Sequence, residues 1–150
     1  MKVILQRVSE AKVEVNQKVI GSVKRGILLL VGIVESDNDL DIEWLCKKIC
    51  NMRLFNDTNE KMNLSVVDVG GDILTISQFT LHASTKKGNR PSFIKAAKPE
   101  FAKQTYLEFN NQLSTILGKE IQQGEFGADM KVSLTNDGPV TIILDSKNKE

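Results

Sequence analysis

The spacing of apolar residues restricts the possible folds of this chain more than any other feature of its sequence. Only two long segments repeat apolar residues at helical spacing. The first follows a possible cap at Ser36 or Asp37, and its apolar face consists of Ile42, Leu45, Ile49 and Met52. The second is opened by Pro99 and ended by Gly118, and its face consists of Phe101, Thr105, Tyr106, Phe109, Leu113, Ile116 and Leu117.

The other apolar segments are short enough to be strands. They cover residues 2–8, 11–15, 27–34, 72–82, 120–124, 129–135 and 140–144. Short turns between several of them favour antiparallel pairing, whereas a doubly wound parallel sheet would need more crossover helices. The 150 residues are therefore predicted to form a single domain, 1–150, with a mixed α+β fold.

Charge and hydropathy exclude several classes of protein. The chain has 20 basic and 19 acidic residues, so it is not a basic protein that coats nucleic acid, and we expect no DNA partner. The first residues, MKVILQRVSE, become polar too early for a signal peptide, and no apolar run is long enough to cross a membrane. We expect a cytoplasmic protein with no membrane partner.

Two cysteines, Cys46 and Cys50, lie four residues apart on one face of the first predicted helix. Two thiolates are too few for a structural zinc site, and the single histidine, His82, is distant in the sequence. We expect buried reduced thiols, no metal and no cofactor.

The segment LTNDGPVTII combines two signals that disagree. Asp137-Gly138 between strand-like segments is typical of a hairpin turn. Pro139 follows, however, and proline has no backbone N–H for the returning strand. A hairpin is the expected structure, but it leaves the proline without a role.

The segment LTISQFTLHAS carries the densest group of polar side chains. The alternation of a strand would place Ser77, Phe79 and Leu81 on one face, and on the other Gln78, Thr80 and His82. Thr80 and His82 would then share a face, but residues two apart on a strand are roughly 7 Å apart. That distance is too long for a nucleophile–base pair, so a half-exposed polar strand end is the favoured interpretation.

The segment STKKGNRPSFIKAAK concentrates positive charge. Thirteen of its residues contain five basic side chains and no acidic one: Lys86, Lys87, Arg90, Lys95 and Lys98. Such a run is usually a solvated surface. Beside a polar strand, it is also suited to the phosphates of an RNA.

Four short segments of the sequence, three of them within the stretches above, resemble the signature segments of the D-aminoacyl-tRNA deacylase (D-tyrosyl-tRNA(Tyr) deacylase) family. They are QRV at 6–8, SQFTL at 77–81, GNRPSF at 88–93 and NDGPVT at 136–141. MKVILQRVSEAKVEV at the N-terminus and FGADMKVSL at 126–134 are similar as well, and the segments occur in the family's order over nearly the whole chain. Two positions depart from the family's pattern: Asn16-Gln17, where a glycine turn is usual, and His82, where a small residue is usual.

The resemblance implies a barrel-like, antiparallel-rich sheet with two long helices. It also implies a hydrolase that cleaves the ester between a D-amino acid and the terminal adenosine of tRNA, as proofreading in translation. In the family the Gly-Pro peptide is cis and reaches from one subunit into the active site of its partner. In a homodimer, Gly138-Pro139 would accept hydrogen bonds from the substrate ammonium group and occupy the space of an L side chain, while D-amino acids and glycine would be accepted.

The same resemblance assigns the remaining roles. Backbone N–H groups around Phe79 and Thr80 would stabilise the oxyanion. The pocket floor would be shaped by Ser77, Gln78 and Phe79. Arg7 would steady the incoming loop, and Met130 would pack near the adenosine.

The mechanism and one rival function remain open. Thr80 lacks a convincing base, so we expect the neighbouring ribose hydroxyl to help activate water. The same hydrolase with Thr80 or Ser77 as a covalent nucleophile is one alternative. A non-catalytic RNA- or nucleotide-binding module, in which Gly138-Pro139 is only a turn, is the other.

Overall fold

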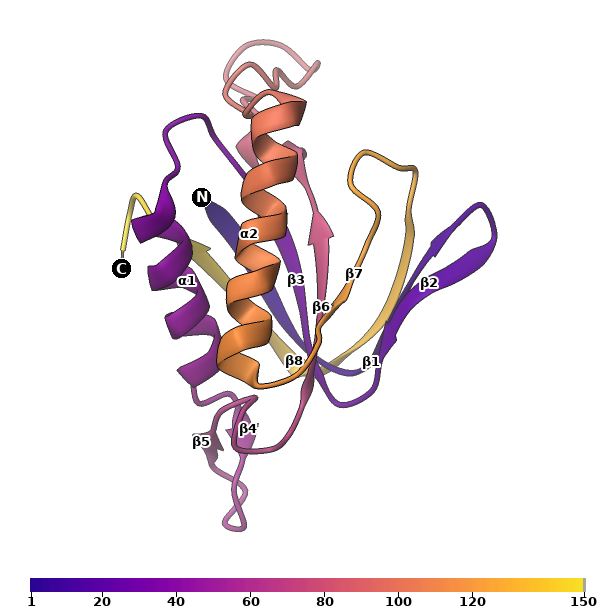
Figure 1. The fold of residues 1–150 in the computed structure, drawn as a ribbon, viewed down its shortest axis with the longest axis vertical. Coiled ribbons are helices and arrows are strands. Elements are labelled where there is room, and N and C mark those ends of the chain that lie inside the picture. The colour runs from indigo at the N-terminus through magenta and orange to yellow at the C-terminus, as the bar shows by residue number, and fades with distance from the viewer. Residues whose placement is uncertain (150) are drawn as a thin grey trace.

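The computed structural model describes residues 1–149 as a curled mixed sheet with two long helices over one face (Figure 1). The helices are α1 (Asp39–Asn51) and α2 (Pro99–Leu117), and η1 (Phe79–His82) is a short 3-10 helix. The longer strands are β1 (Lys2–Val15), β2 (Lys18–Val23), β3 (Gly26–Gly32), β6 (Asp72–Ser77) and β8 (Lys131–Asp145). The short strands are β4 (Phe55–Asn56), β5 (Met62–Leu64) and β7 (Gln122–Gln123).

The sheet runs in the order β2-β1-β3-β6-β7, and β8 pairs with β1. β1 is antiparallel to β2, β3 and β8, whereas β6 is parallel to β3 and to β7. The sheet curls until β2 approaches β7, because a Cβ placed on Gly21 would lie 3.2 Å from the carbonyl oxygen of Gln123. This architecture confirms the expected α+β fold with an antiparallel-rich, barrel-like sheet.

Residues 2–8 and 11–15, predicted as two strands, form the single strand β1. The first half of β1 pairs with β3 and the second half with β2, while β8 follows both halves. Pairing with β8 therefore carries the strand through the exposed positions where the apolar pattern breaks. The turn after β1 is Asn16-Gln17, with φ angles of 49° and 65°. Two left-handed residues are typical of a two-residue hairpin, so the turn forms without the family's glycine.

The hairpin predicted at Asn136–Pro139 is wrong. Residues 131–145 form one strand, antiparallel to β1 on both sides of Gly138-Pro139, so the chain keeps its direction there. The strand pairs Val8↔Asn136 and Gln6↔Thr141 are two residues apart along β1 but five residues apart along β8. Residues 137–140 therefore bulge out of the ladder, and the missing N–H of Pro139 costs no strand pairing.

The two predicted helices are confirmed, with one change of cap. α1 begins after Asn38 instead of Ser36 or Asp37, because Asn38 and Asp41 form a capping box in which each side chain accepts a backbone N–H of the other. α2 has Pro99 in its first turn and ends at Gly118, whose φ of 74° is left-handed.

The apolar faces of the two helices pack on the sheet in one core cluster. From the helices this cluster includes Ile42, Leu45, Ile49, Tyr106, Phe109 and Leu113. A second cluster lies within the curled part of the sheet and consists of Val8, Ala11, Val13, Val23, Leu28, Leu74 and Ile76. Within residues 1–149, no helix is both long enough and apolar enough to span a bilayer.

Both cysteines lie in the core and are free. Burial raises the pKa of the Cys46 thiol far above its ordinary value and that of Cys50 to about 11. These thiols are therefore protonated and unreactive at neutral pH. No cluster of three or more His, Cys, Asp or Glu side chains suited to a metal ion occurs in the described part of the chain.

Candidate functional site

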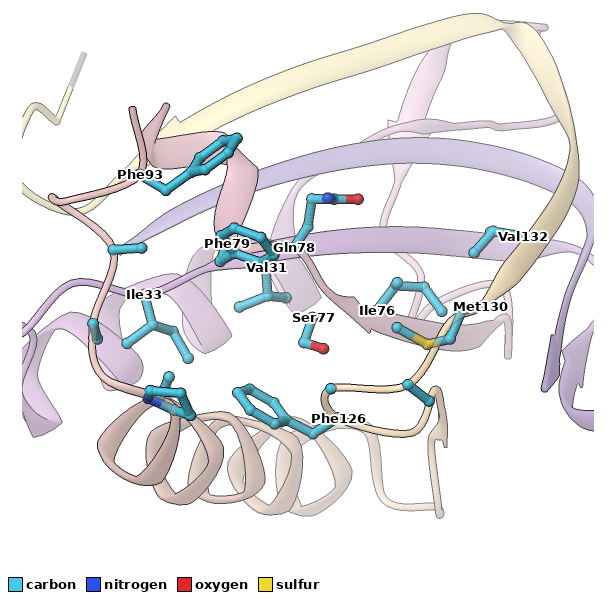
Figure 2. A pocket seen from close by; sticks show the side chains of 16 residues that line it. Val31, Ile33, Ile76, Ser77, Gln78, Phe79, Phe93, Phe126, Met130 and Val132 are labelled. Carbon is cyan, nitrogen blue, oxygen red and sulfur yellow. The ribbon is translucent and has the colours of Figure 1, made fainter. Parts of the chain in front are cut away.

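A pocket of about 560 Å³ lies between the end of β6, the start of α2 and the segment that leads into β8 (Figure 2). Its wall is largely apolar and includes Val31, Ile33, Ile76, Phe79, Phe93, Phe126, Met130 and Val132. The Ser77 side chain points into the cavity. No lining residue carries an acidic, basic or imidazole side chain. The lining of this chain therefore offers no conventional general base to a reaction in the pocket.

Strand β6 ends at Ser77, at the edge of the pocket, and not at His82 as predicted. The Gln78 N–H still donates to the Val31 carbonyl at 2.7 Å, but β3 ends one residue later at Gly32. With no further strand to pair with, the chain turns into η1. A Cβ on Gly32 would lie 2.9 Å from the Leu81 Cβ, so glycine permits this close crossing.

The early end of β6 changes the arrangement of Thr80 and His82. Thr80 Oγ1 accepts a hydrogen bond from the Gln78 side-chain amide at 2.6 Å. His82 is buried, and its Nε2 has no hydrogen-bond partner among residues 1–149. Burial lowers the pKa of His82, and the chain's amino terminus and Lys2 lower it further. The shared face predicted for Thr80 and His82 is therefore wrong, because both residues lie in a 3-10 turn.

Three aromatic rings stand around the pocket. Phe79 and Phe93 meet edge to face, with centroids 5.1 Å apart and an interplanar angle of 74°. Phe126 lies on the opposite side of the cavity and packs on Tyr106, with the two ring centroids 6.0 Å apart. Flat apolar surfaces of this kind suit an aromatic ligand such as a nucleobase.

A buried polar network supports the floor of the pocket, and the sequence did not predict it. The Tyr106 hydroxyl lies 2.9 Å from Thr75 Oγ1 and donates to the Thr75 carbonyl at 2.9 Å. Asn110 accepts from Thr75 Oγ1 at 2.9 Å and donates to the Gln123 side chain at 2.6 Å. The network ties β6 and β7 to α2 two residues before Ser77. The sequence held two signals of this network. One was the polar Thr75 within an apolar strand, and the other was the pair Tyr106 and Asn110, four residues apart on one helix face.

Met130 lies in the pocket wall because Gly124 leaves room for its side chain. A Cβ on Gly124 would lie only 2.5 Å from the Met130 Sδ and 3.2 Å from the Ile76 Cδ1. Gly124 also donates its N–H to the Thr75 carbonyl at 2.9 Å. The position of Met130 thus depends on the absence of a side chain at residue 124.

Gly138 and Pro139 are not among the residues that line this pocket. Both are exposed in the bulge of β8, and the peptide between them is cis. Arg7, which is buried, donates from Nε to the Asp137 carbonyl at 2.8 Å and from Nη1 to the Leu54 carbonyl at 2.6 Å. Arg7 therefore holds the bulge of its own chain.

The bulge is also braced by Asn136. Its Oδ1 accepts the Val140 N–H at 2.8 Å, and its Nδ2 donates to Thr141 Oγ1 at 3.0 Å. Of the residues named from the sequence, the structure brings four together around the pocket, namely Ser77, Gln78, Phe79 and Met130. Thr80 follows directly in η1, whereas Arg7, Gly138 and Pro139 form a separate group.

Comparison with known proteins gives a consistent set of matches. Residues 4–145 match the family model described as D-Tyr-tRNA(Tyr) deacylase. A protein of Flavobacterium psychrophilum named D-aminoacyl-tRNA deacylase is 62% identical over 150 residues and all of both chains. Proteins of the same name from Christiangramia forsetii (60%, 99% of both chains) and Bacteroides fragilis strain NCTC 9343 (59%, all of both chains) are similar to the same extent.

Two solved structures have the same fold. One, titled c-Myc DNA Unwinding Element Binding Protein, is 41% identical, with a TM-score of 0.92 over 97% of this chain and 98% of that chain. The other, titled as a probable eukaryotic D-amino acid tRNA deacylase, is 16% identical, with a TM-score of 0.82 over 95% and 97% of the two chains. At 16% identity the second match supports the fold alone.

Proposed function

Because the chain belongs to the D-Tyr-tRNA(Tyr) deacylase family, we propose that it hydrolyses the ester bond of D-aminoacyl-tRNA and releases the free D-amino acid and tRNA. The family predicted from the sequence motifs is confirmed by these full-length matches. The observation that carries the proposal is the position of SQFTL, whose first three residues line the 560 Å³ pocket. Such an enzyme would act in the cytoplasm, where charged tRNA is used.

The pocket would take the terminal adenosine and the ester. We assign the adenine to the apolar wall near Phe79, Phe126 and Met130, where flat and polarisable groups are available. The ester would then lie at the end of β6, with the Ser77 side chain close by. Ser77 and Gln78 would shape the floor on which the ester rests.

Stabilisation of the developing oxyanion is assigned to the backbone N–H groups of Phe79 and Thr80. These residues open η1, and the first N–H groups of a helical turn have no acceptor within the turn. The Gln78 side chain makes no capping hydrogen bond to them, and its amide N–H donates to Thr80 Oγ1. Backbone donors aimed at an oxyanion are among the larger single contributions to ester hydrolysis.

Activation of the attacking water is assigned to the ribose hydroxyl next to the ester. The pocket wall offers no carboxylate, amine or imidazole, and Thr80 Oγ1 is in contact with an amide N–H donor that cannot accept its proton. A group carried by the substrate itself is already positioned beside the ester. We therefore favour RNA-assisted hydrolysis over a covalent Thr80 intermediate.

Chiral selection is assigned to Gly138-Pro139 of a second subunit in a homodimer. The bulge is exposed in its own subunit, yet Arg7 and Asn136 hold its backbone firmly. A rigid loop of this kind can insert its carbonyl groups into a partner's pocket, where they would accept bonds from the substrate ammonium group and collide with an L side chain. Many D side chains, and glycine, would escape the collision.

The decisive experiment compares deacylation of matched D- and L-aminoacyl-tRNA, and of glycyl-tRNA, by the purified protein. We expect hydrolysis of several D-aminoacyl-tRNAs and of glycyl-tRNA, with the L esters spared. Binding of tRNA without hydrolysis of any ester would support the non-catalytic RNA-binding module instead. Sedimentation at the assay concentration tests the homodimer, and a fully active monomer would rule out the role of the second subunit.

A further inference from the structure

The closed loop formed by residues 84–92 carries positive charge at the rim of the pocket. Two backbone hydrogen bonds close it, from Ser84 N to Ser92 O at 2.8 Å and from Ser92 N to Ser84 O at 2.9 Å. In Figure 1 the loop lies beyond the first turn of α2, at the top of the view. Its exposed cationic side chains are those of Lys86, Lys87 and Arg90.

The same segment continues into the pocket wall. Phe93, Ala96, Ala97 and Pro99 all line the cavity. The Ala97 N–H donates to the Ile33 carbonyl at 2.9 Å, which anchors the segment to the chain that follows β3. Arg90 is three residues from Phe93, a span of at most about 10 Å. The charges are thus mounted on the structure that forms the cavity.

The charges of the loop are not neutralised within the subunit. No ion pair among residues 1–149 involves Lys86, Lys87 or Arg90. At the other end of the segment, Glu35 accepts the backbone N–H of Lys98 at 2.7 Å. Three cations without counter-ions, exposed at one edge of a pocket, are available to a polyanion.

The rest of the chain has the opposite charge. The whole chain carries +1, so without the five cations of residues 86–98 the remainder carries −4. The net positive charge of the chain thus comes from this segment, which favours the approach of an RNA to this edge of the pocket. The effect is local, because charges are screened beyond roughly 8 Å at physiological salt.

We propose that Lys86, Lys87 and Arg90 bind the phosphates of the nucleotides that precede the terminal adenosine of the substrate, and so direct the 3′ end of the RNA into the pocket. This inference rests on the proposed function. Consecutive phosphates advance about 3.4 Å along a strand, so a span of about 10 Å reaches phosphates within about three nucleotides of the base in the pocket. The contacts are with phosphate groups and are independent of base sequence.

The test compares two triple variants of equal charge. The loop variant is Lys86→Gln, Lys87→Gln and Arg90→Gln. The control variant is Lys18→Gln, Lys24→Gln and Lys61→Gln, which removes three exposed lysines from the first residue of β2, the turn after β2 and the β4–β5 hairpin. Single-turnover deacylation is measured from about 50 to about 200 mM salt on two substrates, D-tyrosyl-tRNA and the D-tyrosyl ester of adenosine.

For the loop variant we expect the half-saturating concentration of D-tyrosyl-tRNA to rise about tenfold or more at about 50 mM salt, and the log–log salt slope to fall by about two to three. Its rate on D-tyrosyl-adenosine should stay within about twofold of wild type, which also shows that the variant is folded. The control variant should match wild type on both substrates.

Loop and control variants with the same salt slope would overturn the inference. Equal half-saturating concentrations of D-tyrosyl-adenosine and D-tyrosyl-tRNA for the wild-type protein would also overturn it, and this test needs no variant. Both results leave the proposed function intact. Failure of the wild-type protein to hydrolyse either ester would instead overturn the proposed function.

Discussion

The pocket at the end of β6 and the bulge of β8 are built in opposite ways. The pocket is enclosed by its own chain, from Val31 to Val132, and contains few polar side chains. The bulge at Gly138-Pro139 is exposed, yet Arg7 and Asn136 hold it with hydrogen bonds to its backbone. Ordering an exposed loop costs conformational entropy that local packing does not return. This contrast is why we propose that the pocket forms within one subunit and that the bulge serves the pocket of a second subunit.

The largest effect is expected from Gly138→Ala. Gly138 has a φ of 138°, and a Cβ there would lie 2.9 Å from the Val140 Cγ2 and 3.0 Å from the Arg7 Nη2. The added methyl group strains this φ and presses on the Arg7 side chain that holds the bulge, and a misplacement of about 1 Å at a positioning group can cost roughly a hundredfold in rate. Single-turnover deacylation of D-aminoacyl-tRNA is the measurement. Gly70→Ala is the control, because Gly70 also has a left-handed φ (61°) but open space around its Cβ.

Mixing subunits sharpens this prediction. Ala128→Trp fills the pocket, since Ala128 lines it, while leaving the bulge intact. If the bulge serves the partner's pocket, an equal mixture of Gly138→Ala and Ala128→Trp subunits should regain about a quarter of the wild-type sites, as half the dimers are mixed and each has one good site. No recovery after verified subunit exchange would place the bulge's role within its own subunit.

Removal of the ribose 2′-hydroxyl tests which part of the site supplies the chemistry. With the 2′-deoxy substrate we expect a loss of about a hundredfold or more, as for a positioned general base. Thr80→Ala should keep a substantial part of the rate, because the Thr80 Oγ1 accepts a hydrogen bond from the Gln78 amide, which cannot act as a base towards it. Rapid-quench assays of both changes give the ranking. The reverse ranking, or a trapped aminoacyl-enzyme, would restore Thr80 as the nucleophile.

Gly124→Ala should alter the pocket while leaving the bulge unchanged. Its Cβ would displace the Met130 Sδ, which lies 2.5 Å away, into the cavity. We expect the half-saturating substrate concentration to rise by about tenfold, equivalent to about 1.4 kcal/mol, with the oligomeric state unchanged. Met130→Ala on the same chain provides the control. In a double-mutant cycle the two changes should be far from additive, since removing the Met130 side chain frees the space that the added methyl group needs.

Tyr106→Phe should loosen the floor of the pocket. It removes a hydroxyl that lies 2.9 Å from both the Thr75 side chain and the Thr75 carbonyl, in the buried core. Leaving buried partners unsatisfied costs about 1–3 kcal/mol of unfolding free energy, measurable by urea denaturation. Thr115→Val on the same helix removes an exposed hydroxyl bond to the Asn111 carbonyl and should cost far less. Equal losses in the two variants would contradict a structural role for the network.

The smallest effect concerns His82, at the far end of η1. Its pKa is lowered in the folded state by burial first, so the unfolded chain binds the proton more readily. Stability is then fully present above the ordinary histidine pKa near 6.5 and falls as the pH drops below it. His82→Gln should weaken this dependence in thermal melts between about pH 7.5 and about pH 5.5. An unchanged pH profile would mean that other groups cause the acid sensitivity.

Local signals in the sequence determined the helices of this protein and most of its strands. Helix α2 begins at Pro99 and ends before Gly118, because a first-turn proline and a left-handed glycine each affect the backbone within one turn of the helix. The ordered family motifs determined the fold class and the family for the same reason, since each is a contiguous stretch. They also led to Ser77, Gln78, Phe79 and Met130, which the fold brings together.

Only the tertiary structure decided where pairing stops and which groups are buried together. Strand β6 ends at Ser77 because its neighbour β3 ends at Gly32. The sequence of residues 72–82 alone does not indicate where β3 ends. The segment around Gly138-Pro139 is a bulge and not a hairpin because both halves of β8 pair with β1, which lies at the opposite end of the sequence. The Thr75–Tyr106–Asn110 network likewise depends on contacts between a strand and a helix. Strand partners and buried polar contacts depend on packing across the whole chain, whereas caps and helical periodicity depend on a few neighbouring residues.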